Sequence, residues 1–186
     1  AAHRGEWVEP RGVDYHGYTL YQLPPNGQGF AALMMLNILK QVDLRRFERG
    51  SPELFHFMVE AKRLAFEAMA GTFADPAYSK IPIDTLLSDE FAKRQFSRIR
   101  PDQVIEPQHL AVPLEGEGDT TYLTVVDGEG MMVSLIQSNY RGMGSGLVPT
   151  GLGFMLQDRG ELFSLDPSHP NVYAPGKRPF HTIIPA

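Results

Sequence analysis

The chain has 186 residues, a net charge of −5 and no cysteine, and its length fits one domain or part of a larger one. Its acidic balance excludes a typical nucleic-acid-binding surface, and the lack of cysteine excludes disulfides and thiolate metal sites. No apolar run reaches membrane-spanning length. The first residues show neither Met nor a signal-peptide pattern, so we expect a fragment or a processed product. The compartment stays open.

The first part of the chain is predicted to be mainly helical. Residues 12–23 are expected to form two short strands around the His16-Gly17 turn. Three helices are expected after them, at residues 29–42, 51–70 and 88–99. Ser51 suits the cap of the helix that it precedes, and Pro52 suits the first turn. The segment 75–87 is expected to be irregular. Residues 100–118 are predicted to be an exposed linker, where a cut disturbs a fold least.

The second part is predicted to begin with a β-hairpin. Residues 121–127 and 131–138 are strand candidates, and the Gly-Glu-Gly at 128–130 suits the turn between them. Five glycines follow within 142–153, and residues 175–184 are expected to form a loop that leads into a strand. Because helices precede strands without alternation, the pattern favours an α+β fold over a doubly wound parallel sheet.

A threonine pair, Thr120-Thr121, begins the predicted hairpin. A threonine hydroxyl becomes a good nucleophile when a base lies beside it, and an N-terminal threonine carries such a base in its own α-amine. Thr120 would reach that state only after cleavage of the bond that follows Asp119. A Thr pair is also an ordinary start for a strand. The local sequence leaves both interpretations open.

Three further features also have two interpretations each. The glycines of 142–153 suit either an anion cradle or a mobile loop. His181 is either a catalytic or a surface histidine, and Lys177-Arg178 either binds a carboxylate or is solvated. The six histidines show no paired metal-ligand spacing, so no metal site is predicted.

Ordered motifs run through nearly the whole chain. They are Leu23-Pro24-Pro25-Asn26-Gly27-Gln28-Gly29, Asp75-Pro76, Ile81-Pro82, Asp119-Thr120-Thr121, Gln137-Ser138-Asn139-Tyr140, Gly144-Ser145-Gly146, Pro170-Asn171-Val172-Tyr173 and Gly176-Lys177-Arg178-Pro179. In this order and spacing they resemble the gamma-glutamyltransferase (glutathione hydrolase) family of N-terminal nucleophile hydrolases, and in particular its branch with cephalosporin-acylase-like members. The resemblance implies an α+β fold that is part of a four-layer αββα sandwich.

The resemblance also implies an enzyme made from a precursor that cleaves itself between Asp119 and Thr120. Residues 1–119 would then be the C-terminal part of a large subunit, ending in a linker at about 100–119. Residues 120–186 would be the N-terminal part of a small subunit that stays associated with it. Thr120 would attack the γ-glutamyl amide of glutathione or a related donor, and water, an amino acid or a peptide would accept the acyl group. No cofactor is implied.

Site residues follow from the same resemblance. Ser138 matches a second hydroxyl that orients the nucleophile and relays its proton in relatives. Donor-binding positions of relatives hold different residues here: Tyr140, Arg159, Leu162, His181 and Thr182. Because an ammonium group needs carboxylate and amide acceptors, these replacements leave two donor classes open. One is γ-glutamyl, and the other is a glutaryl or β-lactam-type side chain.

Two parts of the family's site are implied to lie outside these 186 residues: an arginine for the substrate carboxylate and a Gly-Gly oxyanion hole. Loss of oxyanion stabilisation alone slows a reaction about 10²–10³-fold. We therefore expect the 186 residues by themselves to show no measurable turnover of a γ-glutamyl anilide. A third interpretation is an unprocessed relative that binds or assembles without catalysis, which intact-mass analysis would reveal as a single uncut chain.

Overall fold

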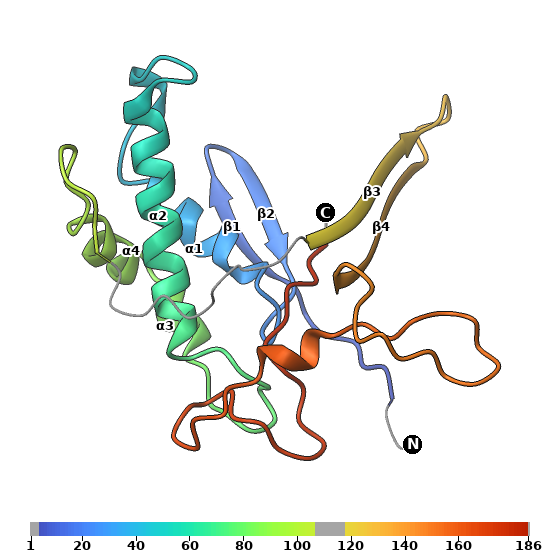
Figure 1. Ribbon diagram of the computed structural model, residues 1–186. Coiled ribbons are helices and arrows are strands. Elements are labelled where there is room, and N and C mark those ends of the chain that lie inside the picture. Colours follow the sequence, from blue (N-terminus) through green and yellow to red (C-terminus); the bar gives the residue numbers. More distant parts are fainter. Residues whose placement is uncertain (1–3, 107–117, 186) are drawn as a thin grey trace. The chain divides into compact units, whose positions relative to one another are not determined.

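The computed structural model describes residues 4–106 and 118–185. Backbone contacts divide them into two compact units. Unit 1 contains residues 4–106 and the C-terminal residues 164–185, and unit 2 contains residues 118–163. The described residues form both helices and antiparallel strand pairs (Figure 1), in agreement with the predicted mixture of helix and sheet. The linker predicted at 100–118 lies mostly outside the described residues.

Four α-helices lie in unit 1: α1 (Phe30–Leu39), α2 (Pro52–Ala70), α3 (Ile83–Leu86) and α4 (Asp89–Phe96). The start of α2 is as predicted, because the Ser51 hydroxyl accepts a hydrogen bond from the Leu54 N–H at 3.2 Å. Ser88 caps α4 through the Phe91 N–H at 3.1 Å in the same way. The short helix α3 lies inside the segment expected to be irregular, so that expectation is partly wrong.

Helix α1 is the centre of unit 1, in contact with α2, α4 and the N-terminal strand pair. It has no side-chain cap, and its stability comes from burial, since a helix that is apolar all round belongs in a core. Phe30, Leu33 and Ile38 have no exposed surface. On α2, Leu64 and Ala65 are buried, whereas Met58 is 40% exposed.

The N-terminal strand pair of unit 1 consists of β1 (Arg11–Tyr15) and β2 (Tyr18–Gln22). They pair antiparallel around His16-Gly17, as predicted. Both turn residues have positive φ, +50° for His16 and +88° for Gly17. This is the backbone that a two-residue hairpin turn requires.

Residues 164–185 complete unit 1 by contacts with its N-terminal half. His181 forms a parallel bridge with Gly27 and its N–H donates to the Asn26 carbonyl at 3.0 Å. The strand expected within 175–184 is reduced to this one bridge in the described residues, because prolines at 179 and 185 remove donors that a ladder needs.

A buried ion pair also joins the two segments of unit 1. Asp75, only 2% exposed, accepts hydrogen bonds from the Arg178 N–H at 2.9 Å and from Arg178 Nη2 at 3.0 Å. The Ala77 N–H donates to the same carboxylate at 3.0 Å. Burial alone would raise the pKa of Asp75, but these hydrogen bonds and the guanidinium charge outweigh it and lower the pKa below its usual value.

Unit 2 is built on the predicted hairpin, with strands β3 (Gly118–Val126) and β4 (Met132–Arg141). The carboxylate of Asp127 accepts hydrogen bonds from the Glu129 and Met131 N–H groups, both at 2.9 Å, and closes the turn. Apart from one register shift near its open end, the ladder is regular. A short 3-10 helix, η2 (Arg159–Leu162), ends the unit.

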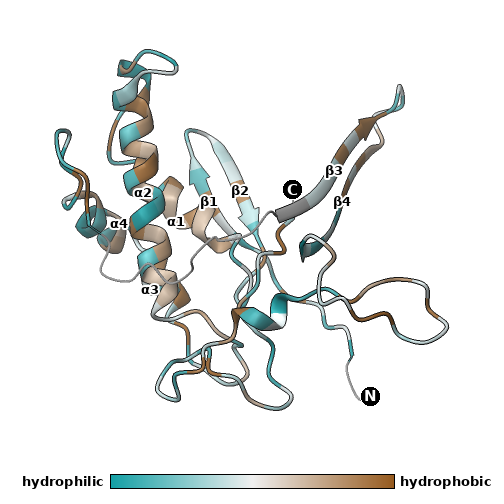
Figure 2. Cartoon of the chain, in the orientation of Figure 1, coloured by the Kyte–Doolittle hydropathy of each residue, from teal (hydrophilic) through white to brown (hydrophobic). Residues whose placement is uncertain are grey.

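Both faces of this hairpin carry exposed apolar side chains. Figure 2 colours the hydrophobic residues of these strands brown. The face that alternates away from Thr120 carries two aliphatic pairs, Leu123–Leu135 and Val125–Val133, and each of these residues is 42% to 54% exposed. A continuous exposed apolar surface marks a site of interaction. Among the described residues, no helix has the length and hydropathy needed to cross a bilayer.

Candidate active site around Thr120

Thr120 and Ser138 face each other across the β3–β4 ladder. Side chains of directly paired residues lie on the same face of a sheet, and here the two hydroxyls meet. Thr120 Oγ1 donates a hydrogen bond to Ser138 Oγ at 2.9 Å. The hairpin register therefore places a second hydroxyl beside the threonine, as the sequence motif predicts.

Ser138 Oγ is also an acceptor for two nitrogen donors. The Tyr140 N–H donates to it at 2.9 Å, and Arg159 Nη2 donates at 3.2 Å. A hydroxyl oxygen has two lone pairs, so these donors and Thr120 leave it little capacity to bind a further proton. The geometry favours an orienting role for Ser138 over a role as a general base.

Arg159 brings a buried positive charge to this cluster. Arg159 is the first residue of η2 and is only 6% exposed. Its backbone N–H donates to the Gln157 side-chain oxygen at 2.7 Å. Burial lowers the pKa of Arg159 below its ordinary value, but a guanidinium stays protonated in proteins at neutral pH. The site therefore carries a fixed cation within hydrogen-bonding distance of Ser138.

Tyr140 completes the cluster. Its ring centroid lies 5.4 Å from the Arg159 guanidinium carbon and 5.7 Å from that of Arg141, within the range of cation–π attraction. Arg141 is held in turn by Glu161, with Nε and Oε1 2.6 Å apart. The backbone of Tyr140 has a φ of +82°.

The glycine-rich loop packs closely on the segment that leads to η2. A Cβ atom on Gly144, whose φ is +62°, would lie 2.5 Å from the Leu156 carbonyl oxygen. The same oxygen accepts hydrogen bonds from the N–H and the hydroxyl of Ser145, each at 2.9 Å. Glycine is therefore needed at 144 for close backbone approach. This gives one of the glycines a packing role in the site.

Sequence reasoning missed the residues that hold this arrangement from the η2 side. Gln157 orients Arg159, Glu161 pairs with Arg141, and the Asp158 carboxylate accepts from the Arg141 N–H at 3.3 Å. The sequence feature that could have indicated these residues is the run of polar and charged residues at 157–161, directly after an apolar glycine-rich stretch. A small hollow of about 230 Å³ opens beside this cluster, lined by Thr121, Gln137, Ser138, Asn139 and Gly142.

Four of the predicted site residues lie together in unit 2: Thr120, Ser138, Tyr140 and Arg159. Two others, His181 and Thr182, belong to unit 1. The His181 carbonyl accepts from the Gln28 N–H at 2.9 Å, and the Thr182 carbonyl accepts from Gln28 Nε2 at 3.3 Å. His181 Nδ1 accepts from the Ile183 N–H at 3.2 Å. Their donor-binding role stays a prediction.

The predicted basic pair has structural partners. Arg178 does bind carboxylates, but they are those of Asp75 and Glu6 within unit 1, with Arg178 Nη1 and Glu6 Oε1 2.8 Å apart. The Lys177 ammonium donates to the Pro170 carbonyl at 2.6 Å. Neither a ligand-binding pair nor a simply solvated pair describes these contacts.

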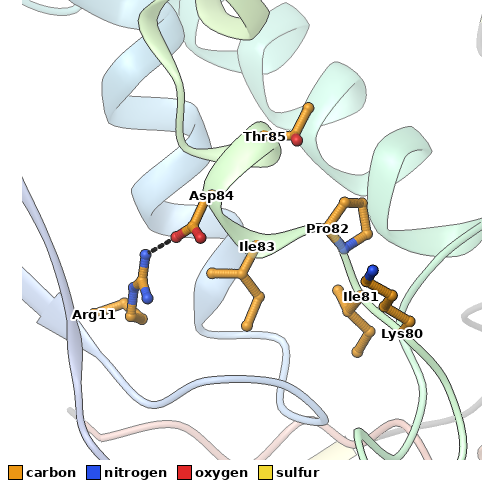
Figure 3. Close-up of a pocket in the computed structure, with 7 residues that line it drawn as sticks. All are labelled: Arg11, Lys80, Ile81, Pro82, Ile83, Asp84 and Thr85. Atoms are coloured by element: carbon orange, nitrogen blue, oxygen red, sulfur yellow. Dashed lines mark hydrogen bonds and ion pairs between the residues drawn. The ribbon is translucent and has the colours of Figure 1, made fainter.

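A larger hollow of about 550 Å³ lies on unit 1 and is lined by Arg11 and residues 80–85 (Figure 3). Two of its charged groups are paired with each other, because Arg11 Nη2 donates to the Asp84 carboxylate. This hollow is therefore a weaker candidate for an active site than the cluster around Thr120.

No group of three or more potential metal ligands occurs in the described ranges, 4–106 and 118–185.

Comparisons with known proteins place these motifs in a family. The family model described as gamma-glutamyltranspeptidase matches residues 1–186. The glutathione hydrolase-like YwrD proenzyme of Bacillus subtilis (strain 168) is 43% identical over 188 residues, and the match covers the whole chain and 34% of that protein. The oxamate amidohydrolase proenzyme of Klebsiella pneumoniae is 36% identical over 185 residues, with the whole chain and 34% of that protein covered.

A solved structure gives the same result. The crystal structure of cephalosporin acylase from Bacillus halodurans superposes with a TM-score of 0.81 at 42% identity, and covers 98% of this chain and 32% of that one. The match confirms the predicted similarity to the acylase-like branch. The chain spans about a third of the length of the curated relatives that it matches. Its full-length family match and these relatives show that the chain belongs to the gamma-glutamyltranspeptidase family.

Proposed function

We propose that the protein containing this chain is an amidohydrolase or acyltransferase of the gamma-glutamyltransferase type, with Thr120 as its nucleophile. The hydrogen bond from Thr120 Oγ1 to Ser138 Oγ, beside the buried Arg159, is the observation that carries the proposal. Two of the similar proteins, named as a glutathione hydrolase-like and an oxamate amidohydrolase proenzyme, support both the reaction class and a precursor.

The first step is cleavage of the precursor. Thr120 Oγ1 attacks the carbonyl carbon of Asp119, the C–N bond breaks, and the nitrogen takes the hydroxyl proton to become the α-amine of Thr120. Water then hydrolyses the resulting ester, which frees the main-chain carboxylate of Asp119 as a new C-terminus and restores the Thr120 hydroxyl. Ser138, already hydrogen-bonded to that hydroxyl, fixes the direction of attack.

Catalysis repeats this chemistry on a substrate amide. The new α-amine accepts the Thr120 hydroxyl proton as the oxygen attacks the substrate carbonyl. The amide C–N bond breaks, the proton passes to the leaving amine, and an acyl-enzyme ester remains. Water releases the acid, whereas an amino acid or peptide amine gives the transfer product.

Self-cleavage is tested by the intact mass of the complete protein. We expect two fragments that meet at Asp119 and Thr120 and stay together during native purification. A single chain that persists on long incubation would support the catalytically silent alternative.

Substitution of Ser138 measures its contribution to cleavage and turnover apart from that of Thr120. We expect Ser138→Ala to slow both cleavage and turnover about 10²-fold, because Thr120 loses the group that orients it. Ser134→Ala is the matched control: Ser134 lies four residues earlier on the same face of β4 and contacts the Tyr122 hydroxyl at 3.1 Å. Equal rates for the two variants, measured by fragment formation and by release of a chromogenic amine, would contradict the role of Ser138.

A specific observation favours a second donor class. A γ-glutamyl donor carries an α-ammonium group, and a fixed guanidinium nearby repels it; at about 6 Å this repulsion is on the order of 2–3 kcal/mol for an effective dielectric constant of 20. Arg159, with the ring of Tyr140 against it, is such a cation. A glutaryl donor lacks the ammonium and avoids the repulsion. The acylase similarity is consistent with this alternative.

The donor classes are distinguished by a ratio of rates. We expect Arg159→Gln to raise kcat/KM for γ-glutamyl anilide relative to glutaryl anilide by about tenfold or more, since the substitution removes the positive charge. The ratio cancels any general loss caused by the Ser138 contact. Arg141→Gln, which keeps the fixed cation at 159, is the control. An unchanged ratio in Arg159→Gln would mean that the donor's α-substituent binds away from this residue.

The proposed fold of the complete protein is the four-layer αββα sandwich. The aliphatic face of the β3–β4 hairpin supports it, because strands with apolar residues on both faces belong between two covering layers. The solved acylase with which the chain superposes supplies further support.

A further inference from the structure

The β3–β4 ladder changes register between Asp119 and Thr120. Thr120 pairs with Ser138. The residue before it pairs with Tyr140, which leaves Asn139 as an extra residue on β4. A bulge of this kind bends its strand and redirects the neighbouring groups. This bulge lies directly opposite the peptide bond whose cleavage the proposed function requires.

The backbone of Tyr140 makes this bulge unusual. Its φ of +82° lies in the left-handed region, which bulky residues rarely adopt. Among the non-glycine residues that the structure describes, His16 is the other with positive φ, but it lies in a two-residue hairpin turn where that conformation is common. Tyr140 lies inside a strand, so contacts beyond the strand must hold its conformation.

Those contacts are visible on both sides of the residue. The Tyr140 N–H points to Ser138 Oγ at 2.9 Å, and the guanidinium groups of Arg159 and Arg141 lie against the ring. Arg141 is fixed by its ion pair with Glu161. The Tyr140 N–H thus connects the bulge to the hydroxyl that receives the Thr120 hydrogen bond, and the side-chain contacts hold the left-handed backbone at the same residue.

We propose that Tyr140 is a positioning residue for cleavage of the Asp119–Thr120 bond and that it acts through its left-handed backbone. The N–H that donates to Ser138 lies in the peptide plane before the Tyr140 Cα, so a negative φ would redirect the chain that follows, and the extra residue would no longer be accommodated opposite the scissile bond. The inference rests on the self-cleavage in the proposed function. The ring serves mainly to hold the backbone.

The test compares Tyr140→Gly with Tyr140→Ala in the complete protein. Both variants lack the ring and differ by one methyl group. Glycine adopts positive φ freely, whereas alanine pays a conformational penalty that leaves only a minor fraction competent. We expect Tyr140→Ala to form the two fragments about 5- to 30-fold more slowly than Tyr140→Gly, as followed by intact mass after cell-free synthesis.

Two further variants separate backbone from side-chain effects. Tyr140→Asn lacks the ring but tolerates the left-handed region, so we expect its cleavage rate to lie within about threefold of the glycine variant. The same Gly and Ala substitutions at Tyr122, which lies on the Thr120 face of β3 in a regular part of the ladder, are the matched control. There glycine should be no faster than alanine, because it weakens a regular strand.

The outcomes distinguish this inference from the function on which it rests. If the parent protein is cleaved at Asp119–Thr120 but Tyr140→Gly and Tyr140→Ala cleave equally fast, the function stands and the positioning role is wrong. If the parent is never cleaved, both are wrong. Thermal unfolding of each variant checks that it is folded, and Tyr140→Ser replaces an alanine variant that fails to fold, with the same expected slowing relative to glycine.

Discussion

Thr120→Ala is expected to abolish both cleavage of the precursor and turnover. Alanine removes the oxygen that attacks the Asp119 carbonyl, so no ester forms and the α-amine of residue 120 is never released. We expect a single uncut chain by intact mass and a loss of amide hydrolysis of at least about 10⁴-fold. The effect is this large because one atom serves as the nucleophile in both reactions.

Two neighbouring substitutions control for this result. Thr120→Ser keeps a hydroxyl at the same place and should retain cleavage, although more slowly, since the β-branch that restricts the side chain is lost. Thr121→Ala changes the next residue, whose side chain alternates to the opposite face of β3, and should cleave at nearly the parent rate. Cleavage of Thr120→Ala at the same bond would show that another residue is the nucleophile.

Asp75→Ala is expected to give a large loss of stability, because its carboxylate joins the two segments of unit 1. The substitution leaves the Arg178 guanidinium and two backbone N–H groups without their shared carboxylate. Breaking a buried pair costs about 3–5 kcal/mol, and the partial exposure of Arg178, 41% for its side chain, places the expected loss at the lower end, about 3 kcal/mol. Denaturant unfolding of the complete protein measures it.

The pH dependence of this pair has a definite sign. Because the pKa of Asp75 is lowered in the folded state, its stabilising contribution is fully present above the ordinary carboxyl pKa of 3.8 and is lost as the pH falls through the lower folded value. The stability difference between parent and Asp75→Ala should therefore be constant near neutrality and shrink in acid. Asp43→Ala, which breaks the exposed pair with Arg45, should have little effect.

Local features of the fold were predictable from the sequence because local chemistry determines them. Ser51 and Ser88 cap the helices that they precede, since a hydroxyl there meets the free N–H groups of the first turn. The β3–β4 hairpin follows from two apolar runs around an Asp-Gly turn. The contact of Thr120 with Ser138 was predictable from a family motif, and the register then places the hydroxyls together.

Long-range features were not predictable in this way. The partner of Arg178 is Asp75, 103 residues earlier, and no local pattern distinguishes an arginine that pairs with a buried carboxylate from a solvated one. The burial of Arg159 and the contacts of its guanidinium arise only when the segment after the glycine-rich loop folds back onto β4. The bulge at Asn139 depends on the pairing of two strands, so neither strand alone indicates it.

Unit 1 takes its residues from both sides of the Asp119–Thr120 bond, and the segment 164–185 is held there by the Gly27–His181 bridge and by Asp75. Before cleavage these contacts close a loop within one chain, at an entropy cost that does not depend on protein concentration. After the proposed cleavage the same contacts join two separate chains, and their dissociation follows mass action. The precursor would then refold equally well at any dilution, whereas the processed protein would recover its structure less completely as it is diluted.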